Sequence, residues 1–312
     1  MLDAVPLFRR MRHRKNVVLS DQAFVEQKLH LPQVTLICVD TANPDLALRA
    51  LNHSMRWISF GAAVLVTAPN HTLSPPPGLQ IVANETISTV RDYSRFMLRD
   101  LLPYVDTSHC LVVQWDGYVL DPTMWRDQFM EFDYLGPIWE RFRNDPRCSC
   151  TGGFTLRSRR LLAALRDEEI QSERPEDVCI ALEYRDRLQD RYGIQYADFE
   201  IAREFAIEDL YERPSAFGFH GVHNLMCLLS DDELSEFLTH APDNVFSGFR
   251  MRRFINQALK NHESDLARHA LIRRRSSVDF QWSELRLWLR LYREQLFSRL
   301  VKSPTREAAI DP

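Results

Sequence analysis

Long apolar runs are missing from this chain of 312 residues. No segment approaches the roughly 20 apolar residues of a membrane-spanning helix, and the opening residues MLDAVPLFRRMRHRK contain no apolar core of a secretory signal. The six cysteines are scattered, several of them within apolar segments, and none has the paired spacing of a zinc site. These absences predict a cytoplasmic protein with reduced, buried thiols.

Several common functional motifs are also absent. The sequence has no phosphate-binding G-x-x-x-x-G-K-[ST] loop, no G-x-G-x-x-G dinucleotide fingerprint and no G-x-S-x-G nucleophile turn. There is no internal repeat and no low-complexity tract. The functional residues must therefore be sought as a dispersed set on a globular chain.

Apolar strands alternate with amphipathic helices in the first part of the sequence. Near-continuous apolar runs at 33–40, 62–68, 79–84 and 110–120 are typical of strands covered on both faces. Helical patterns separate them, at 44–58 and 90–105. This alternation predicts an α/β fold with a mostly parallel, doubly wound sheet. Ligands of such sheets bind beyond the carboxyl ends of the strands.

The pattern changes after residue 122. Short helices and turns follow, then a short strand at 151–158 and helices at 159–167 and 175–193. From 230 onward the pattern is almost wholly helical. The predicted organisation is a basic N-terminal arm (1–31), an α/β domain (32–229) and a helical C-terminal region (230–312).

Asp116 interrupts the apolar segment HCLVVQWDGYVLD. A buried lone carboxylate is costly unless a cation or hydrogen bonds meet it. The period of a strand places Gln114 on the same face, and a carboxylate at a strand end suits Mg²⁺ or Mn²⁺ that bridges phosphate oxygens. The alternative is an aspartate that caps a turn through the backbone.

Three more segments contain candidate residues. Gly152 and Gly153 begin a strand and expose N–H groups to a ligand, or they form a simple bulge. Glu176 and Asp177 begin a helix, where one of them can be a general base or both can complement the helix dipole. His220, in the loop FGFHGVH, is a metal ligand or a solvated loop histidine.

Seven segments appear in a fixed order: YSRFML, HCLVVQWDGYVLDPTMW, FDYLGPIW, GGFTLRSRRLL, PEDVCI, YGIQYAD and FGFHG. This series resembles a poorly characterised bacterial family of GT-A-like glycosyltransferases, whose members carry QWDGFVL, DYIGAPW, GNGGFSLRSR, PED and FGFHG. The resemblance extends over about residues 33–225. It implies a GT-A-like domain, a nucleotide-diphosphate-sugar donor and Mn²⁺ or Mg²⁺.

The resemblance also implies roles for the candidate residues. Asp116, with Gln114, stands where these enzymes carry the D-x-D carboxylates, and His220 stands where many have a late metal ligand. Asp177 is the expected base of an inverting reaction, with Glu176 beside it. The remaining implied contacts are Gly152 and Gly153 in the donor–acceptor cleft and Asp40 and Thr41 near the nucleotide.

Two departures from the family pattern are visible. The D-x-D motif is reduced to Q-W-D, which leaves the metal site one carboxylate poorer. Cys150 and Thr151 replace the usual Gly-Asn before the glycine pair. A catalytically degenerate module that binds a nucleotide sugar or a protein partner is therefore one alternative. A phosphoryl- or nucleotidyl-transfer enzyme is another, although such enzymes cluster more carboxylates around two metals.

The charge is unevenly distributed. Residues 1–15 contain five Lys or Arg and one acid, and residues 248–312 contain 14 Lys or Arg and seven acids. In the segment 283–300, the apolar residues Leu285, Trp288, Leu289, Tyr292, Leu296 and Leu300 form a stripe. Arg286, Arg290, Arg293 and Arg299 lie largely off it. This helix either contacts an anionic membrane, where a lipid-linked acceptor resides, or packs onto protein. A glycan is the other expected acceptor, and no nucleic-acid partner is expected.

Overall fold

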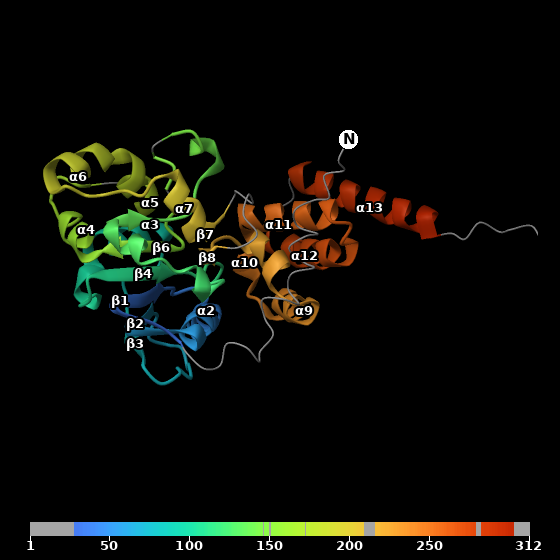
Figure 1. Ribbon diagram of the computed structural model, residues 1–312. Coiled ribbons are helices and arrows are strands. Elements are labelled where there is room, and N and C mark those ends of the chain that lie inside the picture. The colour runs from blue at the N-terminus through green and yellow to red at the C-terminus, as the bar shows by residue number, and fades with distance from the viewer. Residues whose placement is uncertain are drawn as a thin grey trace, which may run out of the picture. The chain divides into compact units, whose positions relative to one another are not determined.

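The computed structural model describes residues 28–145, 147–149, 151–171, 173–208, 216–278 and 282–302 (Figure 1). The chain divides into two compact units, which are described separately. One lies within residues 17–221, and the other includes residues 222–312. The division falls between Gly221 and Val222, ahead of the predicted boundary at 229. The predicted arm to residue 27 lies outside the described residues, and residues 29–31 belong to the first strand instead.

A six-stranded sheet forms the centre of the first unit, in the order β3-β2-β1-β4-β6-β5. The first four strands are parallel, and β6 and β5 are antiparallel to their neighbours. The predicted α/β class and mostly parallel sheet are confirmed. The strands are β1 (Leu29–Val39), β2 (Ile58–Thr67), β3 (Leu79–Ala83), β4 (His109–Val113), β5 (Tyr134–Leu135) and β6 (Thr155–Ser158).

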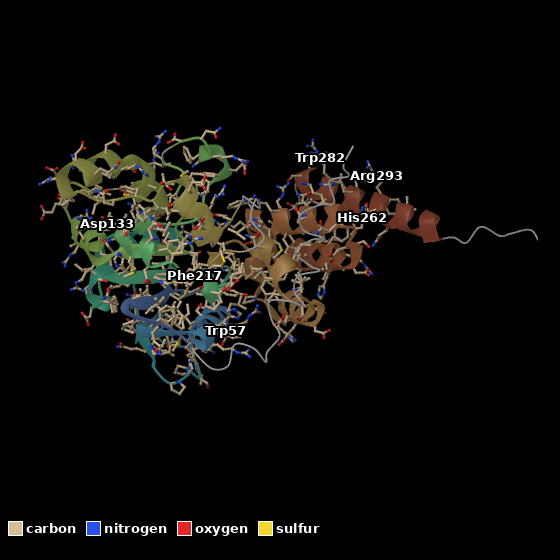
Figure 2. All side chains as sticks on the ribbon, in the orientation of Figure 1. Trp57, Asp133, Phe217, His262, Trp282 and Arg293 are labelled. Carbon is tan, nitrogen blue, oxygen red and sulfur yellow. The ribbon has the colours of Figure 1, made fainter. Side chains whose placement is uncertain are left out.

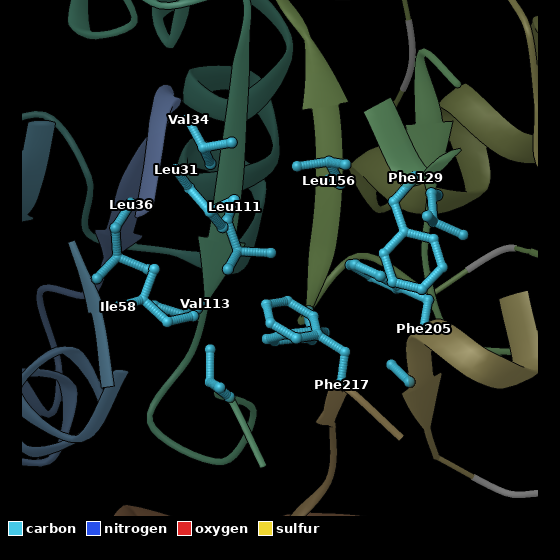
Figure 3. Packing of buried hydrophobic residues seen from close by; sticks show 14 of the residues in the cluster. Leu31, Val34, Leu36, Ile58, Leu111, Val113, Phe129, Leu156, Phe205 and Phe217 are labelled. Atoms are coloured by element: carbon cyan, nitrogen blue, oxygen red, sulfur yellow. The ribbon is translucent and has the colours of Figure 1, made fainter. Parts of the chain in front are cut away.

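Helices cover both faces of this sheet. Alternate residues of β1 enter two different hydrophobic cores: Leu36 packs in one and Ile37 in the other. Figure 3 shows the first core, where Leu36, Leu111 and Phe217 are part of one apolar layer. This burial on both faces explains the continuous apolar runs of the strands. Helices α2 (Pro44–Trp57) and α7 (Phe199–Phe205) contribute to the first core, and α3 (Val90–Arg95), α4 (Arg159–Ala164) and α6 (Arg185–Tyr192) lie on the other side.

The strand order has a switch point between β1 and β4. The chain runs from β1 outward to β2 and β3, and then returns to place β4 on the other side of β1. In open α/β sheets a ligand crevice lies at the carboxyl ends of such strands. Asp40 directly follows β1, and Gln114 directly follows β4.

Several predicted elements are shorter than their patterns indicate, among them the strand at 151–158 and the helices at 90–105 and 159–167. The strand predicted at 110–120 ends at Val113, because Gln114 and Gly117 exchange backbone hydrogen bonds of 2.9 and 3.0 Å that close a tight turn. The helix predicted at 175–193 is interrupted: α5 (Glu176–Val178) leads into a π-helical turn, Cys179–Glu183, before α6 begins.

A small parallel pair completes this unit. β7 (Ala206–Ile207) pairs with β8 (Gly218–Phe219), and β8 also lies beside the chain after the tight turn, since Val119 and Gly218 are bridged. This pair brings the residues that follow each strand, Glu208 and His220, to the carboxyl end of β4.

The unit that includes residues 222–312 is helical among its described residues, as predicted. Its apolar interior contains Met251, Phe254, Ile255 and Leu271. Among the described residues, no helix combines the length and apolar character needed to cross a bilayer. The helices are α8 (Leu225–Leu228), α9 (Asp231–His240), α10 (Asp243–Ser247), α11 (Phe249–Lys260), α12 (Ser264–Ser277) and α13 (Trp282–Lys302).

Candidate functional site

His220 lies at the centre of the candidate site. Its backbone N–H donates to the carbonyl of Ile207 at 2.8 Å, which fixes the residue directly after β8. The imidazole Nε2 is 3.2 Å from Oε1 of Gln114 and 3.7 Å from Oδ1 of Asp116. Three predicted site residues therefore converge. Asp116 and His220 are both buried, so neither is a solvated loop residue.

Glu208 is a site residue that the sequence analysis missed. Its Oε1 is 3.3 Å from Nδ1 of His220, and its other oxygen accepts a hydrogen bond from the hydroxyl of Thr151. A carboxylate at one ring nitrogen fixes the orientation of an imidazole and leaves the other nitrogen directed to a ligand. The sequence signal for Glu208 is an acid directly after the apolar pair Ala206 and Ile207, the same pattern that marks Asp40 after Cys38 and Val39.

The glycine pair serves close packing. A Cβ atom on Gly153 would lie 1.9 Å from Nε2 of His220, and one on Gly117 would lie 2.9 Å from its Cδ2. Neither Gly152 nor Gly153 has left-handed backbone angles, and both are buried. The N–H of Gly152 donates to Oδ2 of Asp177 at 3.3 Å, so this N–H is already used within the protein.

The two acids of the PED segment have different surroundings. Glu176 is buried, with Oε1 3.4 Å from Nη2 of Arg157 and Oε2 accepting from the hydroxyl of Ser94 at 3.4 Å. Asp177 is half-buried and accepts from the N–H of Gly152. Burial, together with the negative charge of Glu176, raises the pKa of Asp177 to about 6. A carboxyl group with this pKa is suited to general base catalysis near neutral pH.

Arg157 and Tyr93 connect these groups to the sheet and to α3. Arg157 is fully buried on β6, and its Nη1 has no hydrogen-bond partner among the described residues. The hydroxyl of Tyr93 accepts a 2.9 Å hydrogen bond from the amide of Gln114. Burial raises the pKa of Tyr93 well above its usual value, and the nearby charge of Glu176 adds to this shift. Tyr93 therefore stays a neutral phenol at physiological pH.

Asp40 and Thr41 lie at the other side of the switch point. Oδ1 of Asp40 accepts from the N–H groups of Ala42 and Asn43 at 2.9 and 2.7 Å, which fixes the turn into α2. Burial raises the pKa of Asp40, and the charge of Asp116 contributes to the same shift. The two strand-end acids are therefore electrostatic neighbours, while Thr41 is half-buried in the same turn.

The chemistry of the site suits a cation. Asp116 and Glu208 are buried on either side of one imidazole, with Asp40 near Asp116, and the buried Arg157 lies beside Glu176. A carboxylate oxygen, an amide oxygen and an imidazole nitrogen are suitable ligands for Mn²⁺ or Mg²⁺. Within the part of the chain that the structure describes, no group of three or more His, Cys, Asp or Glu side chains is arranged to hold a metal. Phosphate oxygens would have to complete the coordination of a cation at this site.

Part of the chain is similar to a known protein family. Residues 78–220 match the family described as Protein of unknown function (DUF5672). No curated protein matches the chain. The matched segment begins just before β3 and ends at His220, so it contains the cluster around His220 and the PED acids but not Asp40 and Thr41. The chain is thus similar, over the segment that builds the site, to a family without an assigned activity.

Proposed function

We propose that the protein is a GT-A-like glycosyltransferase that transfers a sugar from a nucleotide-diphosphate sugar to a hydroxyl group, assisted by Mn²⁺ or Mg²⁺ and with inversion. One observation carries this proposal. Asp116, Gln114 and His220 converge at the carboxyl end of β4, beside the switch point. Adjacent glycines connect this cluster to Asp177, whose pKa is about 6.

The cluster around His220 is the proposed cation and diphosphate site. Asp116 and His220 would hold the cation, and Gln114, oriented by Tyr93, would support them. Such a cation neutralises the charge of the diphosphate leaving group. Oε1 of Glu208 lies 3.3 Å from Nδ1, on the side of the ring away from Asp116, while Nε2 lies 3.7 Å from Oδ1 of Asp116.

Asp177 is the proposed base. It would accept the proton of the acceptor hydroxyl as that oxygen attacks the sugar carbon on the side opposite the leaving diphosphate. Its raised pKa makes the carboxylate a stronger base than an exposed aspartate while keeping it ionised at neutral pH. Glu176 acts as a positioning residue, because Arg157 and Ser94 hold it within the protein. Asp40 and Thr41 would approach the nucleotide, and a glycan or a lipid-linked sugar is the proposed acceptor.

The test measures hydrolysis of a panel of uridine- and guanosine-diphosphate sugars with Mn²⁺, and the thermal shift that each donor causes. Asp116→Asn removes one charge from the cluster and is expected to lower turnover at least 100-fold. Asp106→Asn is the matched control, because Asp106 is an exposed carboxylate at the opposite end of β4. Glu208→Gln is expected to weaken Mn²⁺ binding about 10- to 100-fold. Equal turnover of the two aspartate variants would rule out the proposed role of Asp116.

A binding module without catalytic activity is the second candidate. The reduced Q-W-D motif and the small number of candidate ligands among the described residues favour it. A sugar nucleotide that raises the melting temperature equally with and without Mn²⁺, and is never turned over, would support this candidate.

A further inference from the structure

Helix α13 has an exposed face that contains large apolar side chains. Trp282 is 75% exposed, Leu289 59%, Tyr292 62% and Leu296 41%. On the opposite side of the helix, Leu287 and Leu291 are buried against the neighbouring helices α11 and α12. One side of α13 therefore packs against α11 and α12. The exposed apolar residues form a separate surface on the other side of the helix.

Arginines lie next to these apolar residues. Arg286, Arg290 and Arg293 are exposed. At about 100° per residue, Arg286 and Arg293 fall within about 40° of Trp282, on the side away from Tyr292. Figure 2 shows Trp282 and Arg293 projecting from the same side of α13. The exposed face thus has an apolar half and a basic half.

The acids of α13 point toward the other helices of this unit. Glu284 is paired with Arg274 at 2.9 Å, and Glu294 contacts Nδ1 of His262. Among the described side chains, the exposed face of α13 therefore has positive charge alone. This sorting of charge is not visible in the sequence, where Glu284 and Glu294 stand on either side of Arg286, Arg290 and Arg293.

The exposed stripe differs from the predicted one. Leu285 and Trp288 are half-buried, and Trp282 joins Leu289, Tyr292 and Leu296 on the exposed face. The side chains of Arg299 and Leu300, which the prediction included, lie outside the described part of the chain.

We propose that this face of α13 binds an anionic lipid surface. Trp and Tyr are enriched at the level of lipid headgroups, leucines bury apolar area below it, and arginines bind the phosphate groups. A second copy of the chain is a poorer partner, because a symmetric contact through this face would bring its arginines together without acids to balance them. The proposal is independent of the proposed catalytic function, since it involves residues of α13 alone.

The experiment measures cosedimentation of the full chain with vesicles. Vesicles of phosphatidylcholine and phosphatidylglycerol are compared with vesicles of phosphatidylcholine alone, and we expect binding to the first kind. Arg286→Gln with Arg293→Gln is expected to weaken this binding about 25-fold. The matched control is Arg268→Gln with Arg275→Gln, which removes the same charge from exposed positions on α12. Leu289→Ser with Tyr292→Ser tests the apolar half, and thermal unfolding verifies that every variant is folded.

Three results would overturn the proposal. One is equal binding of the chain to both kinds of vesicle, or to neither. Another is an equal loss of binding in the α13 and α12 arginine pairs, which would indicate a diffuse charge effect. The third is a concentration-dependent dimer in sedimentation that Leu289→Ser with Tyr292→Ser dissociates, which would make the face an interface between copies.

Discussion

Glu176 and Asp177 are adjacent in the chain but differ in how their charges are compensated. Glu176 contacts the buried guanidinium of Arg157 and the hydroxyl of Ser94. Asp177 accepts hydrogen bonds from the backbone N–H groups of Gly152 and Val178, and the negative charge of Glu176 acts on it. The carboxylate of Glu176 therefore stabilises the folded protein. The ionised carboxylate of Asp177 lowers the free energy of unfolding.

We expect Asp177→Asn to raise the free energy of unfolding at neutral pH and Glu176→Gln to lower it. The folded pKa of Asp177, about 6, lies above its unfolded value, so ionisation of Asp177 lowers the stability of the native state as the pH rises from about 4 to 6. Asp177→Asn should therefore stabilise the protein at pH 7 by on the order of 2 kcal/mol, and lose this advantage toward about pH 4. Glu176→Gln should destabilise it by about 3 kcal/mol, because Arg157 loses its buried carboxylate.

Urea unfolding of the wild type and both variants, measured from about pH 4 to pH 8, tests this prediction. The informative quantity is the sign of each difference at neutral pH. A destabilised Asp177→Asn variant would mean that its carboxylate contributes to stability in the way that Glu176 does.

Single residues of the site were predictable where a local pattern marks them. Asp116, His220 and the PED acids each interrupt an apolar segment or occupy a short loop with a recognisable order. Glu208 and Arg157 were missed because their importance depends on contacts 12 and 19 residues away along the chain, with His220 and Glu176. Burial of an arginine in a strand cannot be seen until the partner is known.

At the scale of elements, the packing of Gly153 and Gly117 against the loop after β8 limits where the imidazole can lie. The imidazole of His220 has little freedom to move. The backbone N–H of His220 is hydrogen-bonded to the carbonyl of Ile207, and Oε1 of Glu208 lies 3.3 Å from Nδ1. Gly153 therefore leaves space for the imidazole of His220. A glycine is required at position 153 because of a residue that follows it by 67 positions.

Gly153→Ala should disrupt this contact. Its Cβ would lie 1.9 Å from Nε2 of His220, so the strand or the loop must shift. We expect a loss of about 1–3 kcal/mol of stability and loss of Mn²⁺ binding. Gly193→Ala is the control, because at φ 65° it strains the end of α6 by about 1 kcal/mol without a clash. Calorimetric titration with Mn²⁺ distinguishes the two variants, and unchanged binding by Gly153→Ala would contradict the expected contact.

The interiors of the elements were predictable and their ends were not. β1 and β4 are buried on both faces, which requires apolar runs that the sequence shows directly. β4 ends where Gln114 and Gly117 exchange backbone hydrogen bonds, and a π-helical turn at Cys179–Glu183 separates α5 from α6. Gly117 marks the turn after β4 in the sequence, whereas no single residue type marks the π-helical turn.

At the scale of the whole molecule, both cores that enclose the sheet are formed by residues 31–217. All of the site residues, from Asp40 to His220, lie within residues 17–221 as well. The charge imbalance noted in the sequence follows this division, because the basic α13 belongs to the other unit. Fold and site are thus both contained in the unit within residues 17–221.

A chain of residues 17–221 should therefore fold without residues 222–312. Its cores lose no member, so the free energy of unfolding per residue should stay within the ordinary range of about 0.05–0.15 kcal/mol. Any sugar nucleotide that raises the melting temperature of the full chain should raise that of the shortened chain as well, because no donor contact is proposed beyond His220. Vesicle binding, in contrast, should disappear with α13.

Circular dichroism, cooperative urea unfolding and thermal shift on the shortened chain test these expectations. Loss of cooperative unfolding would mean that the helical unit contributes to the stability of the sheet, and loss of donor binding alone would mean that it contributes a residue to the site.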